Sequence, residues 1–320
     1  MPSRKTASPA DKPFNDFVQP FLIDHSTIRG RLVRLEKSLN NILTAHNYPP
    51  VVSRHLAEQI VLAALLSATL TGDGILTVQA KGDGPVRFIV VDVLAGGIVR
   101  GYADVDELAL AGVHGDSLPH VLGKGYLAVT LDPGGAAERY QGIVELSGES
   151  MSDSFRGYFR QSQQAEVLVH VAVRTPDKKH KKWSAGGIII ERVPGEGGKE
   201  SELTPEEQEE LWKRTGLFMN TLKDAEMLDA QVTPQNLLYR LFNEDGVWVY
   251  KLQPLKNGCR CSRKRVSSVL KSLPKEELID SLDDEGKISV HCQFCNKRER
   301  YTKADIEKLF VVPALKKKAR

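Results

Sequence analysis

Apolar residues near the start of the chain recur at helical spacing. Between residues 31 and 46 they fall three or four positions apart, which predicts a helix that ends before Pro49 and Pro50. The residues that carry this spacing are Leu32, Leu35, Leu39, Ile42 and Leu43. A second helix is predicted over 51–69. It is more apolar than a surface helix, so we expect it to lie at the centre of the core.

After residue 70 the pattern changes to short β-branched runs separated by Gly and Pro, which predict strands. These runs are 75–80, 87–93, 97–102, 126–131, 142–146, 167–173 and 187–191. A helix over 150–162 interrupts them. This mixture predicts an α+β N-terminal domain of sheet and helix over 14–200. The polar residues 1–13 that precede it are expected to form a disordered tail.

A mainly helical linker is predicted over 201–258, after a flexible break at 194–200. Thr204, with Pro205 and Glu207 after it, is typical of a capped helix start, and Thr233 opens another helix. Residues 247–252 predict a strand. The linker carries large apolar side chains among its acids, at the spacing of ordinary core packing. They are Leu211, Trp212, Phe218, Met219, Leu222, Leu238, Leu241 and Phe242.

All four cysteines of the chain lie in its last 62 residues, as Cys259-x-Cys261 and Cys292-x-x-Cys295. Two close pairs that converge are the usual ligand set of a tetrahedral zinc site, and four thiolates leave no open position for water. The spacing therefore predicts one structural Zn²⁺ per chain in a C-terminal domain over 259–320. A module this small buries little surface, so we expect it to depend on the metal for its fold.

The same spacing leaves two roles open for these cysteines. They could belong to an inert zinc ribbon, or they could sense oxidants. One residue separates Cys259 from Cys261, so a disulfide between them would close a small ring, and strained disulfides are the labile, regulatory ones. Arg260, Arg263 and Lys297 are basic neighbours that would favour the reactive thiolate.

Length and composition predict a soluble protein of about two domains, because the chain has 320 residues, 41% of them apolar and 27% charged. No apolar run reaches the ~18 residues of a membrane span, and the N-terminus lacks the apolar core of a secretory signal. We therefore expect a cytoplasmic protein without a membrane partner. Net charge is +3, but residues 259–320 carry 16 basic and nine acidic residues, so the positive charge is concentrated there.

The cysteine pattern and a series of motifs resemble the bacterial heat-shock protein 33 family of redox-regulated chaperones. The resemblance covers nearly the whole chain and includes the segments CRCSRKRV and HCQFCNKRERYT. The N-terminal motifs are Arg29-Gly30, Gly82–Pro85, Arg100–Tyr102, Leu122–Gly125, Tyr140–Gly142, Tyr158–Gln164 and Ala185–Gly187. The chain departs from the family pattern at Gln163 and Gln293, where an acid is common, and in the Lys-rich stretch DKKHKKWS before Ala185.

The resemblance implies a holdase chaperone that needs no ATP and is inactive when reduced and zinc-bound. Oxidation would form the disulfides Cys259–Cys261 and Cys292–Cys295, release zinc and unfold the C-terminal domain and the linker. The opened protein would dimerise and bind unfolding proteins. The client-binding residues expected from the resemblance are Leu211, Trp212, Phe218, Leu222, Leu238, Leu241 and Phe242. In the resting state we expect the strand face of the N-terminal domain to cover them.

Other functions have weaker support in the sequence. The basic C-terminal domain suggests a zinc-ribbon nucleic-acid binder, but aromatic residues are few there, so we do not expect nucleic acid to be a partner. Cys292-x-x-Cys295 does not begin the helix of a βαβ unit, as it would in a thiol oxidoreductase. Gly82-Asp83-Gly84 lacks the Lys-Ser/Thr of a phosphate-binding loop and predicts a hairpin turn. We therefore expect no enzyme activity.

Overall fold

The structure, a computed structural model, describes residues 16–310 except 24–27, 71, 136 and 193–202. The predicted tail at 1–13 and the predicted break at 194–200 lie outside the described residues. The chain divides into two compact units, one ending at Gly258 and the other beginning at Cys259. The predicted linker segment, 201–258, lies within the first of these units.

The first unit contains two sheets of six strands, which we call sheet A and sheet B. The strands of sheet A run in the order β10 (Val247–Val249), β1 (Phe17–Ile23), β2 (Ile28–Leu35), β9 (Ser184–Arg192) and β8 (Val167–Arg174), and β11 (Gln253–Pro254) also pairs with β1. The order in sheet B is β12 (Lys256–Asn257), β5 (Ile98–Val105), β4 (Val86–Leu94), β3 (Ile75–Gly82), β6 (Gly125–Asp132) and β7 (Tyr140–Glu145). Each of the seven predicted strands is present.

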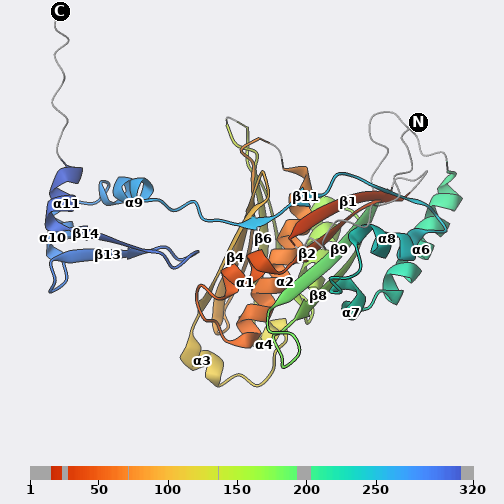
Figure 1. Ribbon diagram of the computed structural model, residues 1–320, viewed down its shortest axis with the longest axis horizontal. Helices are drawn as coiled ribbons and strands as arrows, with labels where there is room; N and C mark the ends of the chain where they lie inside the picture. The colour runs from red at the N-terminus through yellow and green to blue at the C-terminus, as the bar shows by residue number, and fades with distance from the viewer. Residues whose placement is uncertain (1–15, 24–27, 71, 136, 193–202, 311–320) are drawn as a thin grey trace, which may run out of the picture. The chain divides into compact units, whose positions relative to one another are not determined.

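Helix α2 (Pro50–Leu66) packs between the two sheets (Figure 1). It is buried along almost its whole length, as its apolar sequence predicts, and it shares one core with Val33 and Ile189 of sheet A and Val91 of sheet B. The other helices of the first unit that precede β9 are short: α1 (Lys37–Leu43), α3 (Glu107–Ala111), α4 (Leu118–Leu122) and α5 (Met151–Tyr158), the last followed by a π-helical turn at Phe159–Gln163. The mixed α+β class is confirmed.

The helix predicted over 31–46 is wrong in its first part, because β2 extends to Leu35 and α1 begins at Lys37. Strand β2 lies inside sheet A and is buried on both faces, so its apolar residues do not alternate with exposed ones. Strand β1 is absent from the predicted set, and β10 ends at Val249 rather than at residue 252. Gly82–Pro85 forms the predicted hairpin turn between β3 and β4.

A third layer of helices covers the face of sheet A that points away from α2. It consists of α6 (Pro205–Thr221), α7 (Asp224–Met227) and α8 (Pro234–Phe242) (Figure 1). The start of α6 is fixed by the predicted capping box of Thr204 and Glu207, and Thr233 caps α8 through the backbone N–H of Asn236. These helices and sheet A enclose a second apolar core, separate from the one around α2.

The second unit is built on a hairpin of β13 (Lys287–His291) and β14 (Arg298–Thr302). The helices α9 (Arg263–Leu270), α10 (Lys275–Asp280) and α11 (Lys303–Leu309) complete it. Ser262 caps α9, Pro274 precedes α10, and Thr302 forms a capping box with Asp305. Its core has four buried apolar side chains, from Leu270, Leu278, Tyr301 and Ile306.

Across both units, no helix of the described residues has the length and apolar character needed to cross a bilayer.

Candidate functional site

Two backbone segments of the second unit hold the four cysteines. Cys259 and Cys261 lie just before α9, whose start Ser262 fixes by accepting a hydrogen bond from the Arg265 N–H. Cys292 and Cys295 lie in the turn between β13 and β14. That turn is closed by hydrogen bonds from Cys292 N to Lys297 O (3.0 Å) and from Asn296 N to Cys292 O (2.8 Å).

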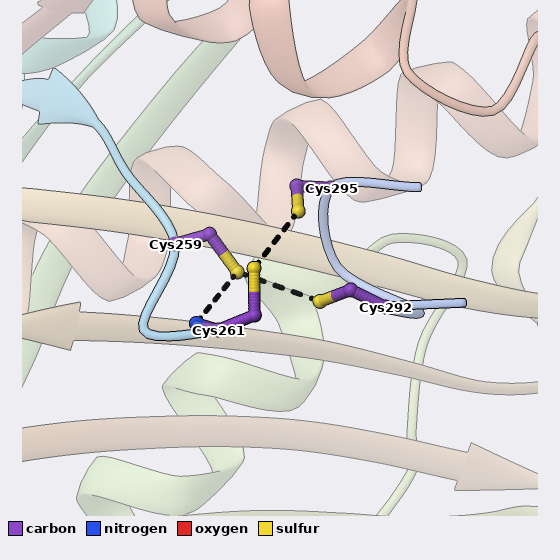
Figure 2. A group of neighbouring side chains, drawn as sticks. All are labelled: Cys259, Cys261, Cys292 and Cys295. Atoms are coloured by element: carbon purple, nitrogen blue, oxygen red, sulfur yellow. Dashed lines mark hydrogen bonds between the residues drawn. The ribbon is translucent and has the colours of Figure 1, made fainter. Parts of the chain in front are cut away.

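The four sulfur atoms converge on one point (Figure 2). Cys259 Sγ lies 3.5 Å from Cys292 Sγ, Cys261 Sγ lies 3.4 Å from Cys295 Sγ, and all four sulfurs lie within 4.8 Å of one another. All four residues are half-buried and have free thiols. Among the described residues, this is the one cluster of three or more His, Cys, Asp or Glu side chains with metal-binding geometry, and His291 is not part of it.

The thiols influence one another's ionisation. Burial opposes the charge on Cys259, but hydrogen bonds from the Cys261 N–H and from the other thiols outweigh it, and the pKa of Cys259 falls to about 7. Burial, together with the neighbouring sulfurs, raises the pKa of Cys261; burial also raises that of Cys295. Each thiolate in the cluster makes it harder for its neighbours to ionise. Four thiolates this close therefore need a cation to offset their charge.

Acidic side chains neutralise part of the basic charge near the cysteines. Lys297 Nζ lies 2.8 Å from Glu299 Oε1. The Arg263 guanidinium lies 4.3 Å from the centre of the Tyr301 ring and pairs with Glu299 and Asp305 at 3.5 and 3.4 Å. These contacts tie the basic side chains into the fold of the second unit.

The apolar linker residues singled out in the sequence lie in the core between α6–α8 and sheet A. Phe242 is fully buried, with its ring stacked on Phe21 of β1 (centroids 5.9 Å apart) and edge-on to Phe218 (6.4 Å). Trp212 lies under the guanidinium of Arg192, 5.3 Å from it. Phe218 is half-buried, and the following residues are buried: Leu211, Trp212, Met219, Leu222, Leu238, Leu241 and Phe242.

The sheet residues beneath the linker are absent from the set predicted as functional. They include Phe17 and Phe21 of β1 and Ile188 and Ile190 of β9. Their signal in the sequence is the alternation of β1, in which every second side chain faces this core. Gly30 of β2 leaves room for the Phe21 ring, because a Cβ at residue 30 would lie 2.1 Å from Phe21 Cζ.

Comparisons with known proteins agree with this architecture. A family model described as Hsp33 protein matches residues 16–302. A protein named 33 kDa chaperonin from Caulobacter vibrioides is 38% identical over 288 residues, covering 88% of this chain and 93% of that protein. Its namesake from Vibrio parahaemolyticus is 34% identical over 300 residues, covering 92% and 96%.

A solved structure shares the fold. The crystal structure of the 33 kDa chaperonin (Hsp33 homologue) from Thermotoga maritima superposes with a TM-score of 0.75 at 22% identity, covering 92% of this chain and 98% of that one.

Proposed function

This chain belongs to the Hsp33 family of chaperones, and on that premise we propose that it is a redox-regulated holdase that works without ATP. The reduced, metal-bound protein is inactive. Oxidation of the four cysteines releases the metal, unfolds the second unit and the linker, and exposes apolar surface that binds unfolding proteins. No catalytic step is part of this activity.

Zn²⁺ is the proposed ligand of Cys259, Cys261, Cys292 and Cys295, one ion per chain. Zinc–thiolate bonds of ~2.3 Å in a tetrahedron place the sulfurs about 3.8 Å apart. The sulfur pairs at 3.4 and 3.5 Å, and the 4.8 Å limit for the whole cluster, bracket that spacing. Four sulfur donors also suit zinc better than they suit Mg²⁺ or Ca²⁺, which prefer oxygen. The ion would hold two chain segments together and offset the charge of the thiolates.

Oxidation would remove this zinc site. For each disulfide, two thiols lose two electrons and two protons, and one molecule of peroxide is reduced to two of water. A disulfide sulfur no longer carries the charge that binds zinc, so the ion leaves. All six sulfur pairs are within 4.8 Å, so the geometry does not choose the pairing. The family resemblance supports Cys259–Cys261 and Cys292–Cys295.

Loss of the metal would unfold the second unit because little else stabilises it. Four buried apolar side chains form its core, and its described cysteines form no disulfide. Structural zinc contributes ~10–16 kcal/mol to small modules of this kind. The proposed switch therefore acts on a unit whose folded state depends on its ligand.

The proposed client-binding surface is the apolar core between the linker and sheet A. It would consist of Leu211, Trp212, Phe218, Leu222, Leu238, Leu241 and Phe242, together with the sheet residues that they cover. Each Å² of apolar surface that becomes exposed costs ~25 cal/mol in water, and contact with an unfolded chain recovers that cost. Exposed acids at the start of α6, such as Glu206 and Glu207, would keep the opened linker in solution.

The cytoplasm is the proposed compartment, because its reducing conditions would keep the four thiols ready to bind zinc. Unfolding proteins are the proposed partners, and a homodimer is the proposed oxidised form.

The observation that carries the proposal is the convergence of four cysteines in a chain of this family. The test follows zinc release and suppression of client aggregation in parallel while peroxide is added to the warmed, reduced protein. We expect both to rise together. A Cys292→Ser, Cys295→Ser variant should bind no zinc as purified, and Ser267→Ala is the matched control in the same unit. Oxidised wild type that protects no unfolding protein would overturn the proposal, even with zinc bound beforehand.

A further inference from the structure

The turn that follows α7 is held to sheet A by a buried arginine. Arg34 lies in β2, on the face of sheet A that the linker covers, and is 4% exposed. Its Nη1 donates to the carbonyl oxygens of Asp229 (2.9 Å) and Val232, and its Nη2 donates to that of Glu226 (3.2 Å). All three acceptors belong to the linker, between the last turn of α7 and the start of α8.

These carbonyls form a natural site for a cation. The Asp229 N–H donates to Glu226 O and the Val232 N–H donates to Asp229 O, so two successive turns direct their carbonyl ends toward Arg34. A guanidinium at such ends acts as a basic residue does at a helix C-terminus. No carboxylate of the described residues lies within ion-pair distance of Arg34. Burial lowers its pKa to about 10, and the nearby charge of Asp229 offsets part of this shift. The burial of this charge is therefore compensated by the linker, through its backbone carbonyls and through the Asp229 carboxylate.

Two further contacts fix the same segment to the neighbouring strands. Gly186 of β9 pairs directly with Arg34, and the fully buried Met227 of α7 occupies the space that its missing side chain leaves. A Cβ on Gly186 would lie 3.0 Å from Met227 Cγ. On β8, His170 Nε2 lies 3.0 Å from Asp224 Oδ1. Residues of β2, β9 and β8 thus anchor residues 224–232 across three adjacent strands.

We propose that Arg34 is the latch that keeps the linker on sheet A, and that its loss opens the linker while the four cysteines stay reduced and metal-bound. This inference rests on the proposed function and adds a control point within the first unit. Without the guanidinium, the Val232 carbonyl loses its donor, and the Asp229 carbonyl keeps one long hydrogen bond, from the Val232 N–H. A buried carbonyl that lacks a hydrogen-bond donor destabilises the docked linker. The open linker is then favoured, because water can donate to the carbonyl there.

The test measures hydrogen exchange of the reduced, zinc-loaded full chain by mass spectrometry, in the wild type, Arg34→Met and Arg34→Lys. Arg87→Met is the matched control, because Arg87 is an exposed arginine of β4 in sheet B. We expect Arg34→Met to raise exchange over 224–242 by about tenfold or more, with unchanged exchange in β3–β6 and unchanged zinc content. Arg34→Lys should be intermediate, because one ammonium group cannot span three carbonyls.

If residues 224–242 of Arg34→Met exchange at the same rate as in the wild type, the latch is overturned. If Arg34→Met raises hydrogen exchange throughout the first unit, exchange over 224–242 is compared in Arg34→Lys and Met227→Ala instead. Exchange at the wild-type rate in both of these variants would overturn the latch. Aggregation suppression separates this inference from the proposed function. If the linker opens in Arg34→Met but the oxidised wild type does not suppress aggregation, the Arg34 latch is supported and the redox-regulated chaperone is rejected. If the oxidised wild type suppresses aggregation but the linker stays closed in Arg34→Met, the chaperone is supported and the latch is rejected.

Discussion

Replacing Phe242 by Ala should open the linker without oxidation. Phe242 is fully buried between Phe21 of β1 and Phe218 of α6, so the change leaves a cavity where α8 meets the sheet. Burial losses of this kind cost ~3–5 kcal/mol. Because ~1.4 kcal/mol is a factor of ten, the equilibrium between docked and open linker should shift by about 140-fold to 3700-fold.

Fluorescence of Trp212 reports the opening, because its ring is buried in the same core. In a Trp183→Phe, Trp248→Phe background, we expect the emission of the reduced, zinc-loaded Phe242→Ala protein to move to longer wavelength. The same sample should suppress client aggregation without peroxide. Tyr239→Ala is the matched control, because Tyr239 is an exposed aromatic residue of the same helix. Equal emission and equal suppression in the two variants would refute the assignment of this core to the switch.

Two further outcomes are expected. Removing the metal from the reduced protein with a chelator should unfold residues 259–310 but leave hydrogen exchange in α2 and β3–β6 unchanged, because the core around α2 lies within the first unit and needs no contact from the cysteines. Hydrogen exchange measures both effects, and protection that persists in α9–α11 would contradict the first. The stability of the first unit should fall as pH drops below about 6.5, because burial lowers the pKa of His55 in the folded protein and the unfolded chain then binds more protons. Melting temperatures across this range should be flatter for His55→Gln, and an equal slope in the two proteins would exclude His55 as the cause.

The sequence predicted features whose cause is local. The capping box at Thr204 involves residues three positions apart, and the alternating strands of sheet B have one face in the core. The cysteine cluster was also predictable, because few arrangements other than a shared metal site bring two such pairs together.

Other features depend on contacts between distant residues, and spacing alone could not predict them. Strand β2 has helical spacing because both its faces are covered, one by α2 and the other by the linker. Its Arg31 is buried because Glu191, from a strand 160 residues away, pairs with it. Arg34 is buried because carbonyls of the linker receive its hydrogen bonds. A charged residue in an apolar run suggests an exposed position until its partners are known.

The separation of the two cores explains how such a protein could open without losing its fold. Sheet A has α2 on one face and the linker on the other, and its inner residues Val33 and Ile189 belong to the core around α2. That core also includes sheet B, so it would persist if α6–α8 left sheet A. Their departure would expose the outer face, including Phe17, Phe21 and Ile188. A rigid sheet that presents aromatic and branched side chains can bind many apolar segments without ordering its own backbone, which lowers the entropy cost of each contact. If instead the first unit melted whenever the linker opened, Phe242→Ala and Arg34→Met would both raise exchange in β3–β6, and the outer face of sheet A could not serve as a preformed surface.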